Sequence, residues 1–180
     1  MRIGIIVGSV REGRLGESVG EWVLQIASGR DASYELIDLK SFDLPLLTSP
    51  VPPAMANRQY NDERVSRWGR AIDDCDGFVF VTPEYNHSVP GAFKNAVDSI
   101  GPEWQGKPVG FVAYASEDGI RAVEAWRQIL ANFSMPTVRN QVSLNLFTDV
   151  TDGKLTPSQR HATRLTAILD ELETLITKLR

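Results

Sequence analysis

Residues 77–100 read GFVFVTPEYNHSVPGAFKNAVDSI, and this stretch decides the fold. Its apolar run, residues 78–81, has the length of a strand and is rich in β-branched and aromatic residues, which suits burial on both faces. Pro83 cannot donate to a ladder, so the strand ends there. Pro90 then occupies a position that a first helical turn tolerates, and apolar residues follow at helical spacing: Phe93, Ala96, Val97 and Ile100. The stretch predicts a strand, a polar loop and a helix, and such loops bind ligands in open α/β sheets.

The same alternation of apolar runs and amphipathic segments extends along the chain. Strands are predicted at residues 3–7, 34–39, 107–115 and 142–146, and helices at residues 16–27, 57–74 and 120–130 and after Ser158. Residues 41–56 are rich in proline and are expected to form a long connection with neither helix nor ladder. The pattern predicts one α/β domain over residues 1–180, a doubly wound parallel sheet with right-handed crossovers.

Composition excludes several classes of function. The 180 residues carry a formal net charge of −4, which gives no electrostatic footprint for nucleic acid or an anionic membrane. No apolar run approaches the length of a membrane span, and residues 1–9 show no signal-peptide cleavage pattern. The single cysteine, Cys75, is expected to be buried near the end of a helix and fits a reducing cytoplasm. His87 and His161 lack metal-ligand spacing, so no metal site is expected.

The loop after the first strand, residues 8–18, reads GSVREGRLGES and leads into a helix N-terminus. Free amides and the helix dipole favour a phosphate there, and Ser9, Arg11, Arg14 and Ser18 offer further donors. The loop lacks the lysine and hydroxyl of a nucleoside-triphosphate loop and the glycine spacing of a dinucleotide fingerprint. What remains is a site for a monophosphate group, such as that of FMN. The alternative is that Arg11 and Arg14 are solvated charges of a loop.

Together the two loops resemble the NADPH-dependent FMN reductase family, flavodoxin-like proteins that include quinone, azo-dye and chromate reductases. The pattern GSVRxGRxG at residues 8–16 is similar to the family's phosphate loop, and PEYNHSVPGAFKNAVD at residues 83–98 is similar to its central motif. The resemblance extends to about residue 142. It implies a flavodoxin-like three-layer sandwich with a five-stranded parallel sheet of order 2-1-3-4-5, non-covalent FMN, and a homodimer or homotetramer.

The resemblance also implies an activity and a set of site residues. The activity is passage of reducing equivalents from NADPH or NADH through FMN to a quinone or other electrophile, a small-molecule acceptor. Because the cofactor carries the hydride chemistry, no catalytic side chain is expected. Six residues would hold the phosphate: Ser9, Arg11, Arg14, Gly16, Glu17 and Ser18. Five would line the ring and ribityl chain: Pro83, Glu84, Tyr85, Asn86 and Ser116.

One departure from the family concerns residues 115–120, which read ASEDGI where relatives often have a glycine-rich turn. Carboxylates of Glu117 and Asp118 near a reduced flavin are unfavourable unless they point to solvent. Two alternatives therefore stand beside the reductase: a flavodoxin-type electron carrier, and a regulatory or interaction module poor in flavin. Two side chains have alternative interpretations. Tyr85 is either a contact of the flavin ring or an aromatic residue of the core, and Glu84 either orients the site through backbone hydrogen bonds or is exposed.

Overall fold

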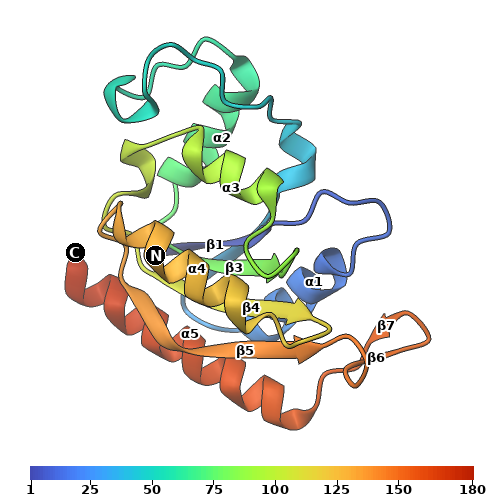
Figure 1. Ribbon diagram of the computed structural model, residues 1–180. Coiled ribbons are helices and arrows are strands. Elements are labelled where there is room, and N and C mark those ends of the chain that lie inside the picture. Colours follow the sequence, from blue (N-terminus) through green and yellow to red (C-terminus); the bar gives the residue numbers. More distant parts are fainter.

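The computed structural model describes residues 1–180 as a sheet of five parallel strands with helices on both faces (Figure 1). The strand order is β2-β1-β3-β4-β5, as the resemblance implies. A separate two-stranded antiparallel hairpin, β6 and β7, was not predicted from the sequence. The strands are β1 (Arg2–Val7), β2 (Ser33–Asp38), β3 (Gly77–Pro83), β4 (Val109–Ala115), β5 (Thr137–Asn145), β6 (Val150–Thr151) and β7 (Lys154–Leu155).

The helices form the two outer layers of a three-layer sandwich. In Figure 1, α1 and α5 lie along one face of the sheet, and α2, α3 and α4 cover the other. The packing agrees, because one apolar cluster joins α1 and α5 to the sheet and a second joins α2, α3 and α4 to it. The helices are α1 (Gly16–Ala27), α2 (Glu63–Asp73), α3 (Gly91–Asp98), α4 (Ile120–Ala131) and α5 (Gln159–Leu179). None of them combines the length and apolar character needed to span a bilayer.

The core explains why the central strands are apolar throughout. Every residue of β3 and β4 is buried, as expected for strands covered by helices on both faces. The ring of Phe80 on β3 meets Trp126 of α4 edge to face, with centroids 5.4 Å apart, and Trp104 at 6.0 Å. Both tryptophans are fully buried within this chain, so they belong to its core.

Two helical regions and one strand differ clearly from the prediction. The helix expected from residue 57 begins at Glu63, because Asn57 and Arg58 have positive φ and the Asp62 side chain caps the first turn. The proline-rich connection contains two single turns of 3₁₀ helix, Leu39–Phe42 and Pro53–Met55, where none was expected. The last strand of the sheet starts five residues earlier than predicted, because its edge position leaves polar residues exposed and breaks the apolar pattern.

The register of the strands brings their carboxyl ends together. Val7 pairs with Val81, Val81 with Val112, and Pro83 with Tyr114. The loops that follow β1, β3 and β4 therefore emerge at one edge of the sheet, on the right of Figure 1. A doubly wound sheet has its ligand crevice at this edge, where the strand order reverses beside β1.

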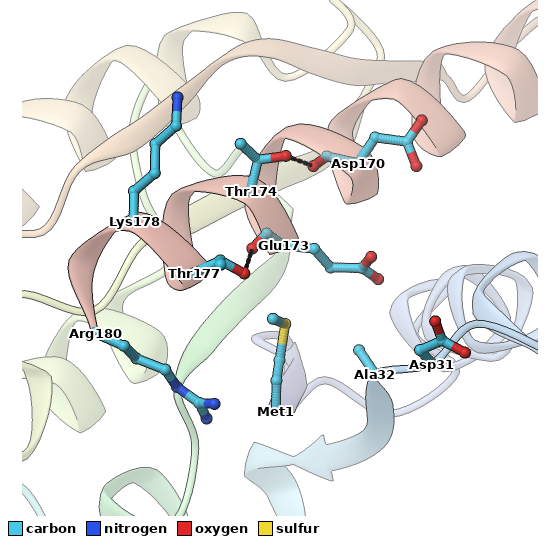
Figure 2. A pocket seen from close by; sticks show the side chains of 9 residues that line it. All are labelled: Met1, Asp31, Ala32, Asp170, Glu173, Thr174, Thr177, Lys178 and Arg180. Carbon is cyan, nitrogen blue, oxygen red and sulfur yellow. Dashed lines mark hydrogen bonds between the residues drawn. The ribbon is translucent and has the colours of Figure 1, made fainter.

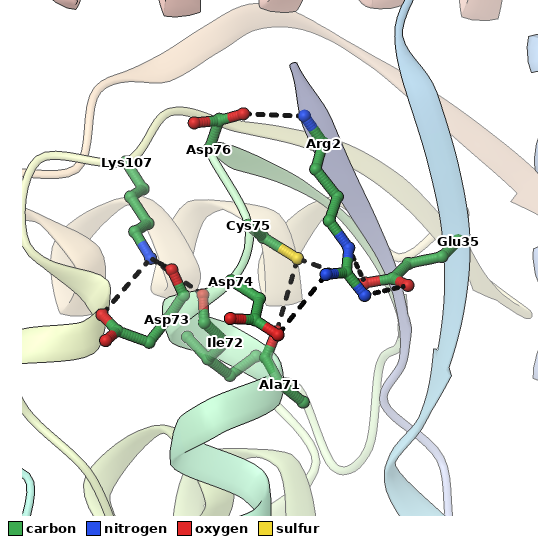
Figure 3. A network of polar contacts seen from close by, with 9 residues as sticks. All are labelled: Arg2, Glu35, Ala71, Ile72, Asp73, Asp74, Cys75, Asp76 and Lys107. Carbon is green, nitrogen blue, oxygen red and sulfur yellow. Dashed lines mark hydrogen bonds and ion pairs between the residues drawn. The ribbon is translucent and has the colours of Figure 1, made fainter.

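The opposite edge is closed by a polar network around Arg2 (Figure 3). Its guanidinium donates two hydrogen bonds to Glu35, at 2.9 and 2.7 Å, and its amide donates to Asp76 at 2.7 Å. Lys107 Nζ donates to the carbonyls of Ile72 and Asp73, the last residues of α2. The network is structural, since it ties β1 to its neighbours and satisfies a helix end.

Candidate active site

Three loops form the candidate site at the carboxyl edge of the sheet. They connect β1 to α1, β3 to α3 and β4 to α4, and in Figure 1 they gather where the blue, green and yellow segments meet. All eleven residues proposed from the sequence lie on these loops, at the end of β3 or in the first turn of α1. The site is therefore assembled from three segments that are separate in the sequence and meet at the carboxyl edge of the parallel sheet.

The N-terminus of α1 has no cap of its own. Leu15 occupies the N-cap position and its side chain makes no capping hydrogen bond. The first helical hydrogen bond runs from the Val19 amide to the Leu15 carbonyl at 3.1 Å. The amides of Gly16, Glu17 and Ser18 precede it and have no acceptor within the helix. This uncapped terminus offers free amides of the kind that bind anions, and phosphate binding there stays a prediction.

The two arginines of this loop have different surroundings. Arg14 is only 7% exposed at its side chain, and it donates to the Ser9 carbonyl at 2.8 Å and to Asp38 at 2.7 Å. Arg11 is exposed, makes no hydrogen bond or ion pair, and lies 5.9 Å from the centroid of the Tyr85 ring. Arg14 therefore anchors the loop to the end of β2, while the guanidinium of Arg11 is the one left to meet a ligand.

A cluster of hydroxyl groups lies beneath the start of α1. The hydroxyls of Ser9 and Tyr85 are 2.7 Å apart. The hydroxyl of Tyr114, from the end of β4, is buried and has no hydrogen-bond partner. Burial raises its pKa, and neighbouring Tyr85 adds to that shift. A Cβ on Gly16 would lie 2.6 Å from this hydroxyl, so the close approach of α1 to the sheet requires glycine there.

The loop after β3 makes a tight turn. The amide of Tyr85 donates to the Ser88 carbonyl at 3.0 Å, and the Ser88 amide donates back to Tyr85 at 3.1 Å. The two residues between them, Asn86 and His87, have φ of 48° and 75°. Left-handed backbone at both central positions is characteristic of a type I′ turn, and it projects these exposed side chains away from the core.

Glu84 points away from this turn and toward α4. Its carboxylate accepts hydrogen bonds from the amide of Arg121 at 3.0 Å, the amide of Ala122 at 3.4 Å and the Arg121 guanidinium at 2.8 Å. Of the two readings considered for Glu84, an exposed carboxylate is wrong, because its side chain is only 6% exposed. Its Tyr85 neighbour is half-buried, between a core aromatic and a surface one.

The two carboxylates of the loop after β4 have different surroundings. Asp118 accepts a hydrogen bond from the Asn145 side chain at 2.8 Å, and the same amide group donates to the Ser116 carbonyl at 2.9 Å. Asp118 has a φ of 63°, so it occupies left-handed backbone where glycine is the easier residue. Glu117 is exposed. The loop is thus ordered by side-chain contacts in place of the glycines that relatives often have.

These features fit the phosphate group of FMN. The donors are the guanidinium of Arg11 on the loop and the uncapped amides and Ser18 hydroxyl in the first turn of α1. They match a phosphate monoester in charge and hydrogen-bonding capacity. The loops after β3 and β4 lie next to it, and the pairing of Pro83 with Tyr114 places their first residues side by side. The proposed residues therefore share one site.

One hollow of the surface lies far from this site and is lined mainly by polar residues. A cavity of about 690 Å³ lies at the opposite edge of the sheet, between α5 and the start of β1 (Figure 2). The carboxylates of Asp170 and Glu173 that border it are paired with Arg30. The hydroxyls of Thr174 and Thr177 donate to carbonyls of their own helix at 2.8 and 2.9 Å. Arg180, which also borders it, is paired with Asp76, so most of its charged and hydroxyl groups already have partners within the chain.

Some residues that shape the site were not found from the sequence. They are Asp38, Tyr114, Arg121 and Asn145, which hold the loops without belonging to a loop motif. Arg121 lies in a segment that resembles the family, at the start of a predicted helix. That position was the one sequence signal that could have pointed to it. The other three become visible only through strand pairing.

Comparison with known proteins agrees with the motifs. The family model described as NADPH-dependent FMN reductase matches residues 1–149. An NAD(P)H-dependent FMN reductase of Nectria sp is 41% identical over 126 residues, covering 67% of this chain and 63% of that protein. The chain thus spans less than two thirds of that relative's length. A quinone reductase of Pseudomonas putida is 31% identical over 148 residues, covering 76% of this chain and 73% of that protein.

Solved structures support the fold. FerB, a flavoenzyme NAD(P)H:(acceptor) oxidoreductase from Paracoccus denitrificans, superposes with a TM-score of 0.76 at 24% identity, covering 98% of this chain and 97% of that chain. At this identity the likeness concerns the flavodoxin-like fold alone. The family match covers most of the sequence, including both loops that carry the motifs. The chain belongs to the NADPH-dependent FMN reductase family.

Proposed function

We propose that this chain is an FMN-dependent NAD(P)H oxidoreductase that passes reducing equivalents to a quinone or another electrophilic small molecule. The observation that carries the proposal is the uncapped N-terminus of α1 beside the unpaired guanidinium of Arg11. Family membership supports FMN as the anion. The quinone reductase among its relatives supports the class of acceptor.

In this proposal the residues of the chain bind and orient. The first-turn amides of α1, Arg11 and Ser18 hold the phosphate, and Arg14 keeps their loop on β2. The turn at Tyr85–Ser88 and the loop at Ser116 border the ring, with Asn86 presented by its left-handed backbone. When bound, FMN supplies the capacity to accept a hydride and to return it to an acceptor. No side chain of the site is needed as an acid or base.

A flavodoxin-type electron carrier is the second candidate, since the fold is shared with carriers. Such carriers have no need to use a nicotinamide. The modest net charge of −4 favours the reductase, because carriers of this type are usually strongly acidic around the flavin. The two candidates differ in whether the protein catalyses repeated oxidation of a nicotinamide.

Steady-state kinetics tests the proposal. The purified protein is loaded with FMN, and oxidation of NADPH and of NADH is followed with benzoquinone as the acceptor. A reductase oxidises at least one nicotinamide at a rate well above that of free FMN at the same concentration. A rate equal to that of free FMN with both nicotinamides would contradict the proposal and favour the carrier.

We also infer a homodimer or homotetramer. The proline-rich connection beside the site carries apolar side chains in solvent, with Leu46 77% and Met55 70% exposed. A strip of this kind at the rim of a site is typical of a subunit contact. Light scattering on the wild type and on a Leu46→Glu, Met55→Glu variant tests this, and a wild type that is monomeric at all concentrations would contradict it.

The proposed location is the cytoplasm. The co-substrates NADPH and NADH belong to the cell interior, and the single cysteine permits no internal disulfide. Fractionation of the host cell tests the location, and recovery of the protein outside the cytoplasmic fraction would contradict it.

A further inference from the structure

The carboxylate of Glu84 closes the N-terminus of a helix to which it does not belong. Gly119 is the N-cap of α4 and has no side chain, and the first turn of α4 contains no acidic residue. The α2 helix, in contrast, is capped by Asp62 immediately before it. Glu84 supplies the missing cap from the end of β3, accepting from the amides of Arg121 and Ala122.

This contact joins the two loops that would border the flavin ring. Glu84 begins the loop after β3, and its amide donates to the Tyr114 carbonyl at 3.3 Å. Arg121 follows the loop after β4, and its guanidinium is 2.8 Å from the Glu84 carboxylate. On its other side that same loop is held by Asn145. Movement of either loop would break hydrogen bonds to a buried carboxylate, which is costly.

The contact also balances charge at this end of the site. The start of α4 carries the positive end of the helix dipole and the guanidinium of Arg121. The negative charge of Glu84 lies against both. With the carboxylate present, the start of α4 offers little net positive charge to a group that gains electrons nearby.

We propose that Glu84 is a positioning residue that fixes the separation of the two ring-bordering loops and, by neutralising Arg121 and the α4 terminus, lowers the reduction potential of bound FMN. This inference rests on the proposed function, because it assigns a role toward the same cofactor. It makes Arg121 a second positioning residue, with an effect on the potential of opposite sign.

The test uses four variants of the full chain: Glu84→Gln, Arg121→Gln, the double variant, and Glu124→Gln as a control. Glu124 is also on α4, with its carboxylate exposed and 3.4 Å from Arg127, outside the loops. For each protein, the FMN dissociation constant is measured by fluorescence titration and the midpoint potential of bound FMN by equilibration with redox dyes. Neither measurement depends on turnover.

Glu84→Gln is expected to raise the potential, because it leaves the Arg121 charge uncompensated, and Arg121→Gln is expected to lower it. Each single variant is expected to weaken FMN binding about tenfold, the loss of one hydrogen bond to a charged group. The double variant is expected to return the potential toward the wild-type value. Glu124→Gln is expected to match the wild type in both measurements.

Two single variants whose potentials equal the wild-type value, or shift in the same direction, would overturn the inference. A purely structural role would weaken FMN binding in both variants without opposite shifts. If Glu84→Gln fails to fold, Arg121→Gln still tests the same ion pair, because the Arg121 side chain is partly exposed and its substitution disturbs the core less. A wild type that binds no FMN would overturn the proposed function instead, so the two failures are distinguishable.

Discussion

The hydroxyl groups of Ser9 and Tyr85 lie 2.7 Å apart, although 76 positions separate the two residues in the sequence. Ser9 belongs to the loop after β1 and Tyr85 to the loop after β3. The contact makes the phosphate side and the ring side of the proposed site one connected unit. It also orients a serine hydroxyl whose residue is almost fully buried.

Tyr85→Phe is expected to weaken FMN binding about fivefold, the usual effect of losing one neutral hydrogen bond. The physical reason is that Ser9 loses the partner that orients its hydroxyl in the phosphate loop. Tyr34→Phe is the matched control, because its hydroxyl donates to Glu173 far from the site. Fluorescence titration measures both, and equal FMN affinity in Tyr85→Phe, Tyr34→Phe and the wild type would contradict the expected coupling.

Substitutions of the two arginines of the phosphate loop are expected to affect different properties, Arg11 the affinity for FMN and Arg14 the stability of the fold. Arg11→Ala removes an unpaired guanidinium and should weaken FMN binding roughly tenfold or more, with little change in the free energy of unfolding. Riboflavin, which lacks the phosphate, should bind the variant and the wild type alike. Titrations with the two flavins check this, and a loss of riboflavin affinity equal to that for FMN would disprove a phosphate contact.

Arg14→Ala is expected to lower the free energy of unfolding by about 2 kcal/mol, because it breaks hydrogen bonds of a buried charged group. Those bonds go to the Ser9 carbonyl and to Asp38. Urea denaturation of the protein without flavin measures the change. Unaltered stability in Arg14→Ala would show that the arginine is not an anchor of the loop.

Gly16→Ala is expected to destabilise the fold by about 1–3 kcal/mol, the range for overpacking a filled space. The new Cβ would lie 2.6 Å from the Tyr114 hydroxyl. Tyr114→Phe removes that oxygen, which has no partner, and should be neutral or stabilising alone. The double variant should recover most of the lost stability. Additive effects in thermal unfolding would mean that another contact excludes a side chain at position 16.

Burial raises the pKa of the Cys75 thiol to about 12. An unfolded thiol ionises near pH 8.5, so the folded state keeps its proton over a range in which the unfolded state loses it. The stability that this provides is complete below about pH 8.5 and is lost as the pH rises toward 12. Cys75→Ala should therefore flatten the fall in urea midpoint above about pH 8.5. An unchanged alkaline slope in the variant would contradict a shift at this residue.

The fold was largely predictable because its central strands are covered on both faces. Runs such as residues 78–81 and 109–115 are continuous and apolar, and the helices between them keep a clear period. The early start of β5 and the β6–β7 hairpin were not predictable, since edge strands and short hairpins leave mixed polar patterns. The late start of α2 depended on left-handed backbone at Asn57 and Arg58, which no periodicity reports.

The loops of the candidate site could be predicted from the sequence, but the contacts that hold those loops in place could not. Motif residues such as Arg11 and Tyr85 follow strand ends, so their shared location could be expected from a parallel sheet. The different surroundings of Arg11 and Arg14 could not, because they depend on Asp38 at the end of another strand. The direction of the Glu84 carboxylate depends likewise on where α4 begins.

An anaerobic titration of the FMN-loaded protein with NADPH and with NADH, followed by visible absorption, tests the proposed reductase activity most directly. We expect bound FMN to be bleached by about one equivalent of at least one nicotinamide and its colour to return on addition of a quinone. A protein that takes up no FMN, or whose bound FMN keeps its colour with both nicotinamides, would contradict it.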